Sequence, residues 1–209
     1  MDITILYEDE HLIFAVKPVG VLSQKGDGEN MIDLLSQNRG EVYPVHRLDT
    51  AVGGVMVFAK TKQAAAKMCA LVSENQLHKQ YLAVLQGALP KESDTLVDLL
   101  FKDSRKNKSF VVKRERKGVK KASLEYDLIS FKDNLSLVKV KLHTGRTHQI
   151  RVQFASRKLP LLGDGKYGSK CNKCSVALWS ESLSFVHPYT KKEIGFTASP
   201  PDRFPWNNF

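Results

Sequence analysis

The sequence of 209 residues has few cysteines, fewer acidic than basic residues, and no long apolar run. Three cysteines, an odd number, do not suggest a disulfide framework, which favours a reducing compartment. No apolar run reaches the roughly 18 residues that indicate a membrane-spanning helix. The first residues, MDITILYEDEH, lack the basic region that opens a secretory signal. The sequence therefore predicts a cytoplasmic protein without membrane association.

The sequence does contain enough apolar material for a core, together with a large excess of basic charge. Apolar residues make up 42% of the chain, which is typical of a folded globular protein. The 32 basic and 22 acidic residues give a net charge of +10, which indicates a polyanionic partner such as nucleic acid. Most of this excess lies in the segment Lys102–Lys121, where ten basic and two acidic residues give +8. That segment is either a solvated loop or a contact to a nucleic-acid backbone.

The hydrophobic pattern predicts an α+β fold with a mixed, mainly antiparallel sheet and flanking helices. Two strands separated by a turn at Glu8–Glu10 open the chain and end at Pro18. Further strands are expected at Val55–Ala59, Lys79–Leu85, Ser109–Val112, Ala122–Phe131, Leu135–Leu142, Val176–Trp179 and Ser182–Val186. Helices are expected at Asn30–Leu35, at Thr61–Glu74 with Thr61 as N-cap, and from about Thr147 to Ser156. Because no repeat or long linker interrupts this order, we predict one domain over residues 1–209.

The stretch VHRLDTAVGGVMVFAKT, residues 45–61, places His46, Arg47 and Asp49 directly before an apolar strand. A carboxylate beside such a strand is partly removed from water, and a nearby cation keeps it ionised. Residues 47 and 49 share one face if the backbone is extended, whereas they can diverge in a turn. Two interpretations stay open from the residues alone: a structural Arg–Asp pair, or an active site whose carboxylate is a nucleophile.

The stretch LHTGRTHQIR, residues 142–151, joins a strand to a helix through Gly145. A helix N-terminus offers free N–H groups to an anion, so Arg146 at this end is expected to meet phosphate. Arg151 lies about 500° further around the helix and therefore points to a different target. The alternative is a basic, solvated helix start. Tyr81, in the strand KQYLAVL, is by pattern alone a core residue.

A lone CxxC motif, Cys171-Asn172-Lys173-Cys174, could be half of a zinc site or a redox pair. No second CxxC and no HxxxH pattern accompanies it, so we interpret it as a turn. The sequence also holds no phosphate-cradling glycine motif. We therefore predict neither a metal site nor a cofactor.

Four motifs taken together give the chain a resemblance to a known family. HRLD, KQYLAVLQG, TGRTHQIRV and PLLGDGKYG occur in the order seen in the RluA-type pseudouridine synthases. The opening ILYEDEHLIFAVKPVGVLSQ and the late LSFVHPYTKKEIGF are similar as well, so that the resemblance runs from about Ile5 to Phe204. It implies the pseudouridine synthase fold with a central RNA-binding cleft, and the isomerisation of uridine in rRNA or tRNA without a cofactor.

The resemblance also implies roles for individual residues. Asp49 matches the nucleophilic aspartate, Tyr81 the tyrosine that stacks on the flipped uracil, and Arg151 the basic partner of the aspartate. Arg47 matches the arginine that displaces the target base, and Leu48 and Ile150 would form apolar walls. The RNA-contacting set that we predict is His46, Arg47, Arg146, His148, Lys113, Arg114, Arg116 and Lys117. For His46 a structural role is the alternative.

Two departures from the family pattern leave the subgroup and the RNA target open. Thr-Ser-Gly of the family is replaced within Ala51-Val52-Gly53-Gly54, and Leu-His-Ala is replaced by Leu178-Trp179-Ser180. We also expect no N-terminal RNA-binding domain of the S4 type, because the motifs begin close to residue 1, and we expect a monomer. Two rival functions remain: a non-catalytic RNA-binding protein, and a nuclease that uses Asp49 and Asp164 to hold metal ions.

Overall fold

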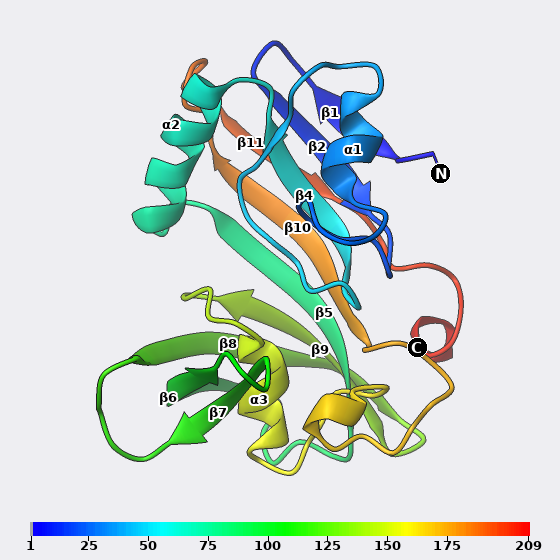
Figure 1. The fold of residues 1–209 in the computed structure, drawn as a ribbon. Helices are drawn as coiled ribbons and strands as arrows, with labels where there is room; N and C mark the ends of the chain where they lie inside the picture. The colour runs from blue at the N-terminus through cyan, green and yellow to red at the C-terminus, as the bar shows by residue number, and fades with distance from the viewer. Residues whose placement is uncertain (1) are drawn as a thin grey trace. The chain divides into compact units, whose positions relative to one another are not determined.

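The computed structural model describes residues 2–209, which form two units (Figure 1). Of these, unit 1 comprises residues 2–80 and Trp179–Pro200, and unit 2 comprises Tyr81–Leu178 and Pro201–Phe209. The chain leaves unit 1 within β5 (His78–Gln86) and returns to it within β10 (Leu178–Val186). The single catalytic domain over residues 1–209 stays a prediction.

Unit 1 is built on a mixed sheet. Its strands follow the order β1 (Ile5–Glu8), β2 (Leu12–Lys17), β4 (Gly53–Ala59) and β10, while β11 (Glu193–Thr197) pairs with β10 and β3 (Tyr43–Pro44) with β4. All these pairs are antiparallel except β4 with β10, which is parallel. The expected opening hairpin is confirmed, since β1 pairs with β2 after a turn closed by the Asp9 carboxylate, which accepts from the backbone N–H groups of His11 and Leu12.

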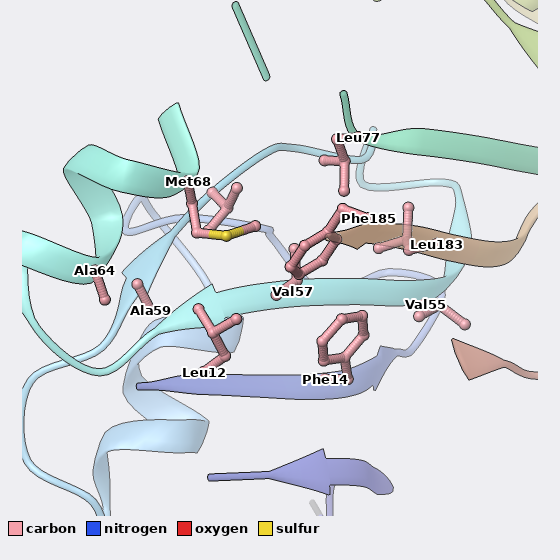
Figure 2. Close-up of a cluster of buried hydrophobic side chains, with 11 residues drawn as sticks. Leu12, Phe14, Val55, Val57, Ala59, Ala64, Met68, Leu77, Leu183 and Phe185 are labelled. Atoms are coloured by element: carbon pink, nitrogen blue, oxygen red, sulfur yellow. The ribbon is translucent and has the colours of Figure 1, made fainter. Parts of the chain in front are cut away.

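The core of unit 1 lies between the sheet and α2 (Lys62–Ser73), as Figure 2 shows. Alternate residues of β4 and β2 point to this side, because side chains of a strand alternate between its faces. The helix contributes Ala64 and Met68, both fully buried. Its N-cap is Thr61, as predicted, whose hydroxyl accepts from the N–H of Ala64 at 3.1 Å. The cluster consists of Leu12, Phe14, Val45, Val55, Val57, Ala59, Ala64, Met68, Leu77, Leu183 and Phe185.

Unit 2 carries strands in the order β5, β9 (Leu135–Leu142), β8 (Val119–Lys132), β6 (Ser93–Asp103) and β7 (Lys108–Val112). The β8–β9, β6–β8 and β6–β7 pairs are antiparallel. The predicted β8–β9 hairpin turns at Asp133 and Asn134, which both have positive φ. Helix α3 (Gln149–Ala155) packs against β6 and β7 in Figure 1. Short 3-10 turns occur at Gly165–Tyr167 (η1) and Trp206–Asn208 (η2).

The structure corrects three expectations about strands. Strand β6 was not expected at all, because Asp94 and Asp98 weaken its local strand pattern; its pairing with both β7 and β8 holds it extended. Residues 178–186 form one strand rather than two. Strand β11 was also missed, and it forms by pairing with β10.

The predicted fold class is confirmed: the described residues form an α+β structure with a mixed, mainly antiparallel sheet. The predicted helices are also present, with α1 at Met31–Ser36 capped by Asn30. Among residues 2–209, no helix is long and apolar enough to cross a bilayer. The central RNA-binding cleft stays a prediction.

Candidate active site

In unit 1, each residue of the loop Leu48–Thr50 has a backbone group that is fixed by a hydrogen bond. The Ser23 hydroxyl donates to the Leu48 carbonyl at 2.7 Å and accepts from the Leu48 N–H at 2.9 Å. The Asp49 carbonyl accepts from the N–H of Val52 at 2.9 Å. The Thr50 carbonyl accepts from Gly20 N–H at 2.8 Å. Because these hydrogen bonds fix the backbone of the loop, they also restrict the position of the half-buried Asp49 carboxylate.

Lys17 provides the cation of this loop. Its side chain is fully buried at the end of β2, and Nζ donates to the carbonyls of Pro18, Val21 and Thr50 at 2.8, 2.6 and 3.3 Å. Burial lowers the pKa of Lys17 to about 8, against the attraction of the Asp49 charge, which raises it. Asp49 therefore stands in the field of a buried ammonium group.

Arg47 and His46 differ sharply in exposure, although they are neighbours in sequence. Arg47 is exposed, whereas His46 is buried and its Nε2 accepts from the backbone N–H of Val57 at 3.3 Å. Burial, helped by the charge of Lys79, holds the pKa of His46 well below its usual value. A neutral, buried imidazole favours the structural role for His46, while the exposed Arg47 can reach an RNA.

The two departures from the family pattern lie against each other in unit 1. Aligning the glycine of Thr-Ser-Gly with Gly54 puts Gly53 in the place of the serine, and Gly53 is the ladder partner of Trp179. A Cβ on Gly53 would lie 2.4 Å from Cζ3 of Trp179, so the indole occupies the space of a side chain at 53. The replacements at 53 and 179 are thus a matched pair.

In unit 2, Arg151 on α3 is held by a buried carboxylate. Its Nε donates to Oδ2 of Asp164 at 2.7 Å, and its Nη2 donates to Oδ1 at 2.8 Å. Arg151 is 6% exposed and Asp164 is 0% exposed. The Arg151 Cζ also lies 5.1 Å from the ring centroid of Tyr167. The rival nuclease hypothesis is disfavoured, because both carboxylate oxygens of Asp164 accept hydrogen bonds from Arg151.

The segment before α3 is fixed by Gln149, which sequence analysis did not single out. Its side-chain oxygen accepts from the Thr144 hydroxyl at 2.8 Å and from the Arg146 N–H at 3.0 Å, and its nitrogen donates to the Ser123 carbonyl. Arg146 is exposed and donates from Nε to the carbonyl of Lys121 at 3.0 Å. The helix begins at Gln149, one or two residues after the predicted start near Thr147 or His148, and His148 is its N-cap at φ 54°. A left-handed backbone at a non-glycine residue is strained, which is common at functional sites.

The remaining predicted residues of unit 2 fall into two environments. Tyr81 lies on β5 with its side chain buried to 6% exposure. The four basic residues Lys113, Arg114, Arg116 and Lys117 are all exposed in the turn between β7 and β8. Arg116 lies over the ring of Phe101, with Cζ 4.8 Å from its centroid. The structure thus places Asp49 in unit 1 and Tyr81 and Arg151 in unit 2, and the Asp49–Arg151 pair stays a prediction.

Comparison with known proteins gives the family. The family model described as RNA pseudouridylate synthase matches residues 11–156, more than half of the chain. The chain belongs to this family. The match confirms the predicted family, and with it the enzyme class of its members, isomerases that convert uridine to pseudouridine in RNA.

Individual relatives of this chain agree with the family. Ribosomal large subunit pseudouridine synthase C of Buchnera aphidicola is 33% identical over 93% of the chain, which spans 66% of that relative. tRNA pseudouridine synthase C of Haemophilus influenzae is 30% identical over 93% of the chain and 91% of the relative. The structure of human RNA Pseudouridylate Synthase Domain Containing 1 superposes with a TM-score of 0.82 at 22% identity, covering 98% of this chain and 85% of that one. This last likeness confirms the predicted pseudouridine synthase fold.

The contacts of several residues near Asp49 in unit 1 and near Arg151 in unit 2 were missed from sequence, although Asp164 was named there as a possible metal ligand. Lys17, Ser23, Asp164 and Tyr167 all lie in motifs that carry the family resemblance, KPVGVLS and GDGKYG. Their roles depend on which side chains are buried together. Only Lys17 could have been noticed from the sequence, because it directly continues an apolar strand. A lysine at such a position is buried only when it has polar partners, so its burial would have indicated a structural or functional role.

The CxxC cysteines of this chain lie against an apolar cluster. Cys171 and Cys174 are partly buried and pack against Val84, Leu162 and Ala177. Burial is the largest cause that raises the pKa of Cys174 to about 11, and the neighbouring Cys171 raises it further. The thiol of Cys174 therefore stays protonated at neutral pH. Cys174 is therefore a weaker nucleophile at neutral pH than an ordinary cysteine, and the interpretation of the motif as a turn stays a prediction.

Proposed function

We propose that this chain isomerises a uridine of rRNA or tRNA to pseudouridine, with Asp49 as its nucleophilic carboxylate. The observation that carries the proposal is the loop around Asp49. Its backbone is fixed by Ser23 and Gly20, and a buried ammonium group, Lys17, faces the same loop. Such fixation is expected of a group that must attack one atom of a bound substrate. The ribosomal and transfer RNA names of the relatives support the substrate class.

The reaction breaks the N1–C1′ bond of uridine, turns the uracil and forms a C5–C1′ bond. The proton on C5 is lost and N1 gains one, so that atoms balance and no electron carrier is needed. An ionised Asp49 acts on the sugar during bond cleavage, through covalent attack or through assistance to a glycal route. Arg151, already held by Asp164, would supply the cation that keeps Asp49 ionised.

The target base must leave the helical stack, at a cost of a few kcal/mol. We propose that Arg47 takes the place of the displaced base and that Tyr81 stacks on the flipped uracil. Base–aromatic stacking contributes about 1–3 kcal/mol, which offsets part of the cost of flipping. The exposed basic turn Lys113–Lys117 would bind the RNA backbone, and with Arg146 and His148 it completes the proposed RNA contacts. We further propose that the protein works as a monomer in the cytoplasm.

The proposal is tested by release of tritium from RNA labelled at uridine C5. Ribosomal RNA and tRNA from cells lacking the gene serve as substrates, since their target uridine is unmodified. We expect the wild type to release tritium and the Asp49→Asn variant to release none above background, with RNA affinity within about threefold of wild type. Asp27→Asn, at an exposed carboxylate of unit 1, is the matched control and is expected to behave as wild type.

The outcomes separate the rival functions. A wild type that binds RNA tightly but releases no tritium from either RNA would make the protein a non-catalytic RNA-binding protein. Release of tritium by Asp49→Asn at the wild-type rate would refute the role of Asp49 while leaving the reaction in place.

A further inference from the structure

The segment Gly163–Gly168, GDGKYG, surrounds Arg151 on two sides and has no role in the chemistry described so far. Asp164 covers one edge of the guanidinium through two parallel hydrogen bonds, from Nε to Oδ2 and from Nη2 to Oδ1. This bidentate geometry fixes the plane of the group as well as its position. The ring of Tyr167 lies 5.1 Å from Cζ and limits motion on a second side.

The Asp164 carboxylate is itself mounted on a rigid turn. Gly163 has φ +77°, and a Cβ there would lie 2.4 Å from the carbonyl oxygen of Ser175. The turn is closed by hydrogen bonds from Asp164 N–H to Leu161, and from the N–H groups of Tyr167 and Ser169 to the Asp164 carbonyl. Asp164 therefore has little freedom to move, and neither has the guanidinium edge that it binds.

Tyr167 connects this turn to two further elements. Its hydroxyl oxygen accepts from the Ser109 N–H of β7 at 2.8 Å and lies 2.9 Å from Nδ1 of His148, to which it can donate. Burial raises the pKa of Tyr167, which keeps this hydroxyl protonated. Arg151, His148 and the start of β7 are thus all in contact with one side chain.

The energetics favour a functional reason for this arrangement. A buried ion pair is often no more stable than apolar residues of the same volume, because both charges lose their hydration. Stability alone therefore does not explain a carboxylate with 0% exposure beside a buried arginine. Orientation of the arginine does explain it, since partners behind a functional group fix its geometry and charge.

We propose that Asp164 is a positioning residue for the isomerisation: it fixes the Nε–Nη2 edge of Arg151, so that the guanidinium is held in one orientation for the role proposed for it above. This inference rests on the proposed function. Asp164 acts through Arg151 and does not contact the substrate.

The first test is Asp164→Asn, which keeps the shape of the side chain and removes its charge. We expect kcat for tritium release to fall by about 100-fold, as misplacement of a reacting group by about 1 Å does, with RNA affinity unchanged. The acid limb of the rate profile should also move to lower pH, because Arg151 keeps its charge and loses the anion that partly neutralises it, which favours the ionised form of Asp49. Asp98→Asn is the matched control: its carboxylate binds Gln153 and Arg157 in the same unit, and its pH profile should stay that of wild type.

A double variant decides the case even if Asp164→Asn folds poorly. Arg151→Met with Asp164→Asn removes both buried charges and should restore folding. If Asp164 acts through Arg151, the double variant loses no more activity than Arg151→Met alone. Multiplied losses in the double variant, or wild-type kcat and pH profile in Asp164→Asn, would overturn the inference. A wild type without any tritium release would instead overturn the proposed function.

Discussion

Lys17 is the residue on which the geometry of the Asp49 loop depends most directly. Its ammonium group holds three backbone carbonyls from two separate segments, residues 18–21 and residue 50, while it is fully buried. A carbonyl that loses such a donor inside a protein carries its full desolvation cost. The side chain therefore acts as a cross-link between the two segments that frame Asp49.

Replacing Lys17 by methionine should loosen this loop. We expect the free energy of unfolding to fall by about 2–4 kcal/mol, since the Val21 and Pro18 carbonyls lose this donor, whereas the Thr50 carbonyl keeps the Gly20 N–H. We also expect kcat to fall at least 10-fold with little change in RNA affinity, because Asp49 is no longer held in place. Urea unfolding and tritium release measure the two effects. Lys25→Met, at an exposed lysine, is the control, and equal behaviour of the two variants would contradict the account.

His46 predicts how stability changes with pH. Its pKa in the folded state is lowered by burial, so between that value and the usual 6.5 the unfolded chain binds a proton that the folded chain does not. This contribution to stability is complete above pH 6.5 and is lost as the pH falls below it, at up to about 1.4 kcal/mol per pH unit. Urea unfolding at pH 7.5 and 5.5 should show a smaller loss in His46→Gln than in wild type. The exposed His78→Gln is the control, and an unchanged loss in His46→Gln would argue against the buried neutral imidazole.

At the scale of elements, the pairing of β4 with β10 depends on the fit between Gly53 and Trp179. The indole fills the space above Gly53, and its Nε1 donates to the carbonyl of Ala198 at 2.7 Å. The residues at 53 and 179 are therefore compatible as a pair, because a glycine at 53 leaves the space that the indole of Trp179 fills.

Restoring the family residues at these positions one at a time should destabilise the protein. Gly53→Ser overpacks the contact and Trp179→His leaves a cavity, and each should cost about 1–3 kcal/mol. The double variant should recover at least about 1 kcal/mol of the summed loss, because the two changes compensate. Unfolding by urea measures this coupling. Gly145→Ser, where an added Cβ meets nothing within 4 Å, is the control, and simple additivity at 53 and 179 would contradict the matched pair.

The turn between β7 and β8 predicts the salt dependence of RNA binding. Arg114 and Lys117 are exposed there and are expected to neutralise phosphates. Replacing both by glutamine should lower the slope of log affinity against log salt concentration by about 1–2. The same charge change at Lys62 and Lys191, exposed in unit 1, is the control. If both variants keep the wild-type slope, the turn is only a solvated loop.

Local patterns predicted most elements but not the contacts between distant ones. Thr61 and Ala64 to Met68 define α2 through a cap and an apolar face, and both are properties of neighbouring residues. Strands β6 and β11 are specified by their partners, so their own sequences gave little signal. The candidate site residues show the same difference between local and distant signals. Asp49 and Arg151 were found through local motifs, whereas the salt bridge between Arg151 and Asp164 depends on the burial of both side chains.

For the whole molecule, charge and family agree on an RNA partner. The net charge of +10 favours binding to a polyanion, and the match to the RNA pseudouridylate synthase family over residues 11–156 gives the chemistry. Asp49 lies in unit 1, and Tyr81 and Arg151 lie in unit 2. The proposed mechanism gives roles to residues of both units, so that a measurement of activity tests both.

The most direct test of the central claim is a map of pseudouridines in total RNA from cells with and without the gene. The account predicts at least one rRNA or tRNA pseudouridine that disappears on deletion. Wild-type protein should restore it, and Asp49→Asn protein produced at the same level should not. An unchanged pseudouridine map after deletion, or full restoration by Asp49→Asn, would contradict the account.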